Sequence, residues 1–199
     1  MNILLLFRIN KLKEQCFIYN EKYNLAKKDA NKVTQYEFFM QTSIENNDFR
    51  LNQEIIVKDS IGREIPIRDL FNNTEDYILV CRFSERYCTD CNSNAIAELR
   101  KLNDAVMTKN ITLFCLYDTD KGLNLMKHSY GIKGMRVYNS PGFNIPAEKK
   151  SYPYYFVMDN TLRVFDVFFP DKYNPEITEK YFKLITEKYF NNATTTKQL

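Results

Sequence analysis

The fold of this chain is decided by one stretch, Tyr77-Ile78-Leu79-Val80-Cys81-Arg82-Phe83-Ser84-Glu85-Arg86-Tyr87-Cys88-Thr89-Asp90-Cys91. Its first half, residues 77–83, is an apolar run that follows a polar cluster at 72–76, which is the pattern of a buried strand. Beyond Cys91 the apolar residues recur at helical spacing, which predicts a helix that begins near the cysteines: Ala95, Ile96, Leu99, Leu102 and Val106. A Cys-x-x-Cys motif therefore stands at a strand-to-helix turn.

The position of the two cysteines at a helix start affects their reactivity. Unpaired backbone N–H groups and the helix dipole favour a thiolate at the start of a helix, where Cys88 lies outermost. Two other interpretations stay open on the residues alone, namely half of a structural zinc site and a pair of inert core thiols. The chain has no second Cys-x-x-Cys and only one histidine, His128, so a four-ligand zinc site would need carboxylates or distant cysteines. We therefore expect a redox pair and no metal site.

The stretch resembles the thioredoxin superfamily, in which an apolar strand leads through an aromatic residue into Cys-x-x-Cys and a helix. The residues that carry the resemblance are Phe83, Tyr87, Cys88 and Cys91. It implies an α/β, thioredoxin-like fold with a central mixed sheet flanked by helices, over roughly residues 51 to 190. It also implies that Cys88 attacks a disulfide, that Cys91 resolves the mixed disulfide, and that Tyr87 covers one side of the sulfur. No cofactor is expected.

A second element of the same superfamily is a proline just before a buried strand, usually with a cis peptide bond that faces the cysteines. Pro153, in Ser151-Tyr152-Pro153-Tyr154, fits this element, and the resemblance predicts a cis bond there. The backbone of Tyr152 would then be free to pair with an extended substrate segment. Tyr87, Tyr152 and Pro153 are thus the expected substrate-binding residues. The alternative from the residues alone is a trans proline that starts an edge strand.

The motif also departs from the superfamily. Thioredoxins carry a buried acid six residues before the first cysteine, whereas this chain has Arg82. Glu85 is a candidate proton acceptor in its place, with a solvated surface charge as the alternative. Asp90 favours a helix start but disfavours ionisation of the neighbouring thiol. Arg82 and Arg86 would favour the thiolate if they point inward. The peroxiredoxin motif of Pro and Thr or Ser is absent around Cys88, so a peroxidase is a minor alternative, as is a metal chaperone.

The elements around this core are read from residue patterns. A hairpin is expected at 54–58 and 64–67, followed by a helical turn at 67–71, and this pair resembles the redoxin branch, which includes peroxiredoxins and TlpA/ResA-type envelope oxidoreductases. After the cysteine helix, which should end near Lys109, the pattern predicts a strand at 111–117 and a helix at 123–130. An irregular loop at 131–150, a hairpin at 154–158 and 163–169, and a last helix from Pro175 follow.

The first fifty residues are expected to form a helical extension, 1–50, ahead of a thioredoxin-like domain, 51–199. Residues 8–49 contain no Pro or Gly, and seven residues follow a heptad seam: Leu12, Cys16, Tyr19, Tyr23, Ala26, Ala30 and Val33. Two interpretations remain open. In the first, a single helix packs on its own domain or stands as a stalk. In the second, the helix forms a weak parallel coiled coil that makes a homodimer.

Composition limits the function further. The net charge of +3 is spread among interspersed acids and bases, which excludes the clustered positive charge of a nucleic-acid partner. The five cysteines are odd in number and widely spaced, so they are no disulfide framework, and Cys81 and Cys115 are expected to be buried and inert. The apolar run Ile3–Phe7 is too short for a bilayer span of about 20 residues.

These observations favour a thiol–disulfide oxidoreductase that exchanges with protein disulfides or dithiols and with a redox partner. The alternative class is a thioredoxin-fold binding or assembly module whose cysteines do not turn over. The TlpA/ResA resemblance favours the bacterial cell envelope over the cytoplasm, with a membrane tether that is missing from this chain.

Overall fold

The computed structural model describes residues 3–71, 76–105 and 110–190 of the chain. Two compact units are present, Met1–Gln41 and Thr42–Leu199. The described residues of the first unit, 3–41, lie within one long helix, α1 (Ile3–Asn46), as the run without Pro or Gly predicts. The helix ends at Asn46, and Asp48 adopts a left-handed conformation with φ of 62° where the chain turns away. The expected domain boundary at residue 50 stays a prediction.

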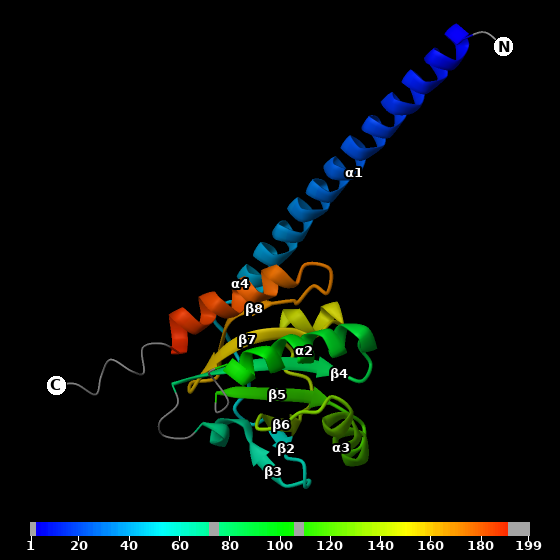
Figure 1. The fold of residues 1–199 in the computed structure, drawn as a ribbon. Coiled ribbons are helices and arrows are strands. Elements are labelled where there is room, and N and C mark those ends of the chain that lie inside the picture. The colour runs from blue at the N-terminus through cyan, green and yellow to red at the C-terminus, as the bar shows by residue number, and fades with distance from the viewer. Residues whose placement is uncertain (1–2, 72–75, 106–109, 191–199) are drawn as a thin grey trace. The chain divides into compact units, whose positions relative to one another are not determined.

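A single mixed sheet forms the centre of the second unit (Figure 1). Its strand order is β1-β8-β7-β4-β5-β6-β2-β3. The strands are β1 (Phe49–Arg50), β2 (Ile56–Lys58), β3 (Glu64–Pro66), β4 (Tyr77–Ser84), β5 (Ile111–Leu116), β6 (Arg136–Asn139), β7 (Tyr154–Asp159) and β8 (Arg163–Phe168). Strands β4, β5 and β6 run parallel to one another, whereas β7 pairs antiparallel with both β4 and β8.

The helices follow the strands in the expected sequence. They are η1 (Ile67–Leu70), α2 (Thr89–Ala105), α3 (Asp120–Ser129), η2 (Pro146–Lys150), α4 (Pro175–Ile185) and η3 (Thr186–Phe190). The core β4-α2-β5-α3-β7-β8-α4, preceded by the β2–β3 hairpin and η1, confirms the prediction of a thioredoxin-like fold of the redoxin type. The expected end of the cysteine helix near Lys109 falls outside the described residues.

The prediction of an irregular loop at 131–150 was wrong in two places, because this segment contains β6 and η2. Strand β6 has four residues, Arg-Val-Tyr-Asn, and such a short mixed run gives no clear strand pattern. It forms because it pairs with β5, with Val137 beside Leu113. Pairing with a distant segment thus decided the structure here, and local propensity did not.

Side chains of β4 alternate between the two faces of the sheet, and this alternation separates Cys81 from Arg82. Cys81 lies beside Tyr155 in the register, and the Tyr155 hydroxyl donates a hydrogen bond of 2.6 Å to the Ala95 carbonyl in α2. The Tyr155 ring also stacks on Tyr181 of α4. Helices α2 and α4 therefore cover the face that carries Cys81, and Arg82 points to the opposite face.

The last helix packs one face on the sheet. Pro175 occupies its first turn as predicted. Phe182 and Ile185 are buried, with the Phe182 ring beside that of Tyr155, whereas Leu184 is 65% exposed. Among the residues that the structure describes, no helix is long and apolar enough to cross a lipid bilayer.

Candidate functional site: the Cys88–Cys91 disulfide and its surroundings

Cys88 and Cys91 form a disulfide at the start of α2, with their Cα atoms 5.2 Å apart. Cys88 immediately precedes the first helical residue and is exposed, whereas Cys91 lies in the first turn and is partly buried. The backbone N–H of Cys91 donates to Cys88 Sγ at 3.3 Å, and the N–H of Asn92 donates to the Cys88 carbonyl at 2.9 Å. The Cys88 sulfur is thus the more accessible of the two and receives an N–H from the helix N-terminus.

The turn between β4 and α2 is held by Ser84 and Asn92. The Ser84 carbonyl accepts from the Tyr87 N–H at 3.0 Å and from Asn92 Nδ2 at 2.8 Å, and Ser84 Oγ accepts from the Arg86 N–H at 3.2 Å. Asn92 is almost fully buried. Sequence reasoning missed this residue, because an Asn in the first turn of a helix gives no sign of whether it faces solvent or the strand behind it.

Arg82 forms a buried ion pair with Glu148 of η2. The Arg82 Nε lies 3.0 Å from Glu148 Oε1, and the Arg82 side chain is 1% exposed. The guanidinium also donates to Ser140 Oγ at 2.6 Å and to the Pro141 carbonyl at 3.0 Å, and it lies 4.7 Å from the centre of the Phe143 ring. Arg82 therefore points inward, but toward the segment 140–150 on the sheet face that α2 does not cover.

The other oxygen of Glu148 holds the same segment. Glu148 Oε2 accepts from the backbone N–H groups of Phe143 at 2.8 Å and Asn144 at 3.0 Å. The carboxylate thus has three hydrogen-bond partners, all of them at the sheet face that α2 does not cover. Glu148 and Arg82 together fix the approach of the chain to Tyr152 and Pro153, and the sequence contained no signal that these two residues would meet.

Tyr87 lies half-buried beside the disulfide. Burial raises the pKa of its phenol, with opposing contributions from the charges of Arg82 and Glu148. Tyr87 is therefore close enough to the buried ion pair to sense both charges, and it is a neutral hydrogen-bonding group at physiological pH. The expected role of Tyr87 in covering one side of the sulfur stays a prediction.

Tyr152 and Pro153 lie at the carboxyl end of β4. Arg82 pairs with Tyr154 in the register, so the two preceding residues run alongside the end of β4 that leads into the cysteine turn. The Tyr152 side chain is 53% exposed, and Pro153 is buried. The prediction of a cis bond before Pro153 was wrong, because the described residues contain no cis peptide bond. Ser151 makes the bend instead, with a left-handed φ of 57°, so the intrinsically favoured trans bond is kept.

Glu85 is placed toward the loop that follows β5. Its Oε1 accepts from the Asp118 backbone N–H at 2.9 Å. Arg86 pairs with the carboxylate of the same Asp118 at 3.0 Å, and both of those side chains are largely exposed. This arrangement ties the turns after β4 and β5 to each other. The role of Glu85 as proton acceptor for the cysteines stays a prediction.

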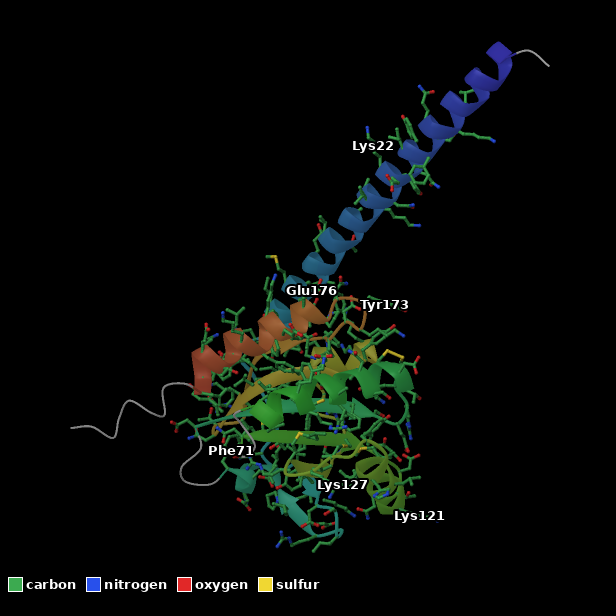
Figure 2. All side chains as sticks on the ribbon, viewed as in Figure 1. Lys22, Phe71, Lys121, Lys127, Tyr173 and Glu176 are labelled. Atoms are coloured by element: carbon green, nitrogen blue, oxygen red, sulfur yellow. A yellow bond between two sulfur atoms is a disulfide. The ribbon has the colours of Figure 1, made fainter. Side chains whose placement is uncertain are left out.

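One contact near the cysteines comes from a segment that sequence reasoning did not consider. Lys172, in the loop between β8 and α4, places its Nζ 3.8 Å from Asp90 Oδ2 in the first turn of α2. The next residue, Tyr173, is 80% exposed, and the Lys172 Nζ lies 5.1 Å from the centre of its ring. Figure 2 shows Tyr173 projecting from this loop near the start of α4, where Glu176 is also labelled. The first turn of α2 is therefore in contact with a lysine from the loop before α4.

The remaining cysteines are not part of the site. Cys81 and Cys115 are buried in β4 and β5, and burial raises the pKa of both thiols. Cys16 is exposed on α1. Within residues 3–71, 76–105 and 110–190, no group of three or more His, Cys, Asp or Glu side chains is arranged to hold a metal ion.

Comparison with known proteins gives the fold context. No family model matches the sequence, and no curated protein matches it significantly. Solved structures with a similar fold include a thiol:disulfide interchange protein from Bacteroides sp., with 12% identity, 72% of this chain and 95% of that chain covered, and a TM-score of 0.49. A thiol peroxidase from Chromobacterium violaceum has 12% identity, coverage of 71% and 87%, and a TM-score of 0.47. BsSco, a member of the Sco family of cytochrome c oxidase assembly proteins, has 12% identity, coverage of 75% and 97%, and a TM-score of 0.45. Because these identities and TM-scores are low, the function has to be argued from the residues of the site.

Proposed function

We propose that this protein is a thiol–disulfide oxidoreductase that exchanges its Cys88–Cys91 pair with disulfides or dithiols of other proteins. The observation that carries the proposal is the disulfide at the N-terminus of α2, with Cys88 exposed and Cys91 behind it. A thiolate at this position is favoured by the helix N-terminus and is open to a partner sulfur. Two inert core thiols would not combine exposure with this pairing.

The reaction follows from the geometry. In the dithiol form, the Cys88 thiolate attacks one sulfur of a partner disulfide, and the other partner sulfur leaves as a thiolate that takes a proton. Cys91 then loses its proton and attacks Cys88 Sγ, which restores the Cys88–Cys91 bond and releases the second partner thiolate. The second partner thiolate also takes up a proton, and Cys88 lost its own proton when it ionised, so in total the partner gains two electrons and two protons and this protein loses them. The reverse sequence oxidises a partner dithiol.

Substrate binding is proposed for Tyr87, Tyr152 and Pro153. Tyr152 is exposed at the carboxyl end of β4, and buried Pro153 fixes the backbone that precedes it. An extended segment of the partner would pair with the Tyr152 backbone and bring its cysteine to Cys88. The Glu85 carboxylate is the proposed proton acceptor. Glu85 lies three residues before Cys88 in the sequence, and its carboxylate accepts from the Asp118 N–H.

Trapping of the mixed disulfide tests the proposal. A Cys91→Ser variant keeps the nucleophile but cannot resolve the intermediate, so it should accumulate a covalent complex with a partner protein through Cys88. The assay uses a Cys16→Ser background, because the exposed Cys16 thiol would otherwise form adducts of its own. A matched Cys88→Ser variant in the same background should trap nothing. If the Cys91→Ser variant forms no adduct and its Cys88 does not react with iodoacetamide, the redox function is refuted.

We also propose a homodimer through α1. Four large seam residues, Leu12, Tyr19, Tyr23 and Val33, are more than half exposed in the single chain. Burial of such a stripe against a second copy would remove this apolar surface from water. Sedimentation of the full chain beside a variant that begins at Thr42 tests the idea, since only the full chain should sediment as a dimer. A monomeric full chain at high concentration would contradict it.

An oxidising compartment, such as the bacterial cell envelope, is the proposed site of action. The support is the resemblance of the hairpin and cysteine motif to envelope oxidoreductases. Rapid acid quenching of cells, followed by alkylation of free thiols, reports the redox state of the pair in each fraction. Recovery of the protein only from the cytoplasmic fraction would contradict this assignment.

A further inference from the structure

The charged side chains near Cys88 are mostly paired with each other. Arg86 is paired with Asp118 at 3.0 Å, and Glu85 accepts from the Asp118 backbone. Arg82 is paired with Glu148 on the sheet face that α2 does not cover. Neither arginine is therefore an uncompensated cation that could stabilise a Cys88 thiolate.

Asp90 is the anion closest to Cys88 in the chain. It lies in the first turn of α2, two residues after Cys88, and its side chain is 82% exposed. A carboxylate there stabilises the helix but opposes ionisation of the neighbouring thiol. The structure places one cation against it, Lys172, with its Nζ 3.8 Å from Asp90 Oδ2.

The loop that carries Lys172 is fixed by its own hydrogen bonds. Asp171 Oδ1 accepts from the Tyr173 N–H at 2.9 Å, and Asp171 Oδ2 accepts from Asn174 Nδ2 at 2.8 Å. Pro175 then begins α4. Because these hydrogen bonds within the turn fix the backbone around Lys172, its contact with Asp90 costs less backbone entropy than one made from an unstructured loop.

We propose that Lys172 is a positioning residue of the redox pair, which acts through Asp90 and offsets the effect of the Asp90 carboxylate on the Cys88 thiolate. This inference rests on the proposed oxidoreductase function for its biological meaning. Loss of the lysine charge leaves Asp90 uncompensated, which raises the pKa of the Cys88 thiol. A stabilised thiolate favours the dithiol form, so a destabilised thiolate favours the disulfide. Loss of the lysine charge therefore makes the pair more reducing.

The expected size is that of an exposed ion pair. Such pairs correspond to about two- to five-fold changes in an equilibrium constant, which sets the upper bound for the effect on Cys88, so the pKa of Cys88 should rise by up to about 0.7 in a Lys172→Met variant. The equilibrium with glutathione should shift toward the disulfide form by about the same factor. A salt concentration of about 1 M, at which the Debye length is about 3 Å, should reduce the difference.

The experiment measures the rate of alkylation of Cys88 by iodoacetamide against pH, in reduced protein with a Cys16→Ser background, with the modified residue identified by mass spectrometry. Lys172→Arg keeps the charge and should behave like the parent, and Lys180→Met is a matched loss of an exposed lysine on α4 that should change nothing. Asp90→Asn should lower the pKa of Cys88 and should shrink the effect of Lys172→Met in the double variant, because the lysine is no longer held.

Two results would overturn the inference. An unchanged pKa of Cys88 in Lys172→Met would remove the electrostatic role, and a Lys172→Arg variant that matches Lys172→Met would show that the residue only shapes the loop. These outcomes are separate from failure of the proposed function, which would appear as no mixed disulfide and no reduction of insulin by the parent protein. The thiol pKa remains measurable in that case.

Discussion

Arg82 Nε and Glu148 Oε1 lie 3.0 Å apart in a buried pair that joins the central strand β4 to the segment in front of Pro153. Arg82 stands at the position where thioredoxins proper carry a buried acid, and in this chain the acid of the pair comes from η2. The pair connects the strand that leads to the cysteines with the segment that leads to the expected substrate-binding residues.

Removal of the acid from this pair should destabilise the fold strongly. A Glu148→Gln variant leaves the Arg82 guanidinium buried without its counter-charge, which should lower the free energy of unfolding by about 3–5 kcal/mol. Urea denaturation followed by circular dichroism measures the change. In the double variant Arg82→Met/Glu148→Gln, the loss should be smaller than the sum of the single losses by about 0.5–3 kcal/mol, and simple additivity would contradict the pairing.

Thiol accessibility should separate the five cysteines into three groups. The folded, oxidised protein should react with Ellman's reagent only at Cys16, since Cys81 and Cys115 are buried and the other two are joined. After mild reduction, Cys88 and then Cys91 should also react with the reagent. The remaining two thiols should react only after denaturation. Mass spectrometry after alkylation identifies each residue. Labelling of Cys81 in the folded protein would contradict its burial.

Truncation of Tyr152 should affect substrate use and leave stability unchanged. The side chain is 53% exposed, so Tyr152→Ala should change the free energy of unfolding by less than about 0.5 kcal/mol. If the tyrosine contacts the partner as an interface anchor, its loss should raise KM by at least about five-fold. Kinetics of reduction of a folded disulfide protein measure this, with Ile61→Ala, at an 84% exposed apolar residue between β2 and β3, as the control.

Stability should fall at alkaline pH. Burial raises the pKa of Tyr155 and Tyr181, and it raises the pKa of Tyr189 to about 12. The folded protein therefore holds these protons above the ordinary pKa of about 10, where the unfolded chain has lost them. Their contribution is fully present below about pH 10 and is lost as the pH rises toward the folded values. The midpoint of urea unfolding at increasing pH measures the loss, and a midpoint constant to about pH 12 would contradict it.

The start of the domain can be located by truncation. A variant that begins at Thr42 keeps Asn46, whose Oδ1 accepts from the Ala147 N–H at 2.9 Å, and β1, which pairs with β8. A variant that begins at Leu51, the boundary expected from the sequence, loses both, and it should be less stable by at least about 1–3 kcal/mol, because the buried Ala147 N–H loses its partner. Equal midpoints of thermal unfolding would support the boundary at residue 50.

Local patterns were sufficient for most of the core. The apolar run in β4, the helical spacing after Cys91 and the turn residues between β7 and β8 predicted their elements, because one strand or helix buries a face that its own residues define. The same patterns failed for β6, because pairing with β5 decided its backbone and that pairing is not written in the neighbouring residues. The resemblance failed for the bond before Pro153, which is trans.

The sequence by itself determined that two cysteines, three apart, would stand between a buried strand and a helix, because spacing and hydrophobic periodicity are local properties. Only the tertiary structure decided which charges surround them. Arg82 meets Glu148 across 66 positions of sequence, Arg86 meets Asp118, and Asp90 meets Lys172 from the loop before α4. Electrostatic energy depends on distance in space, and only the fold brings the two members of each pair within 4 Å of one another.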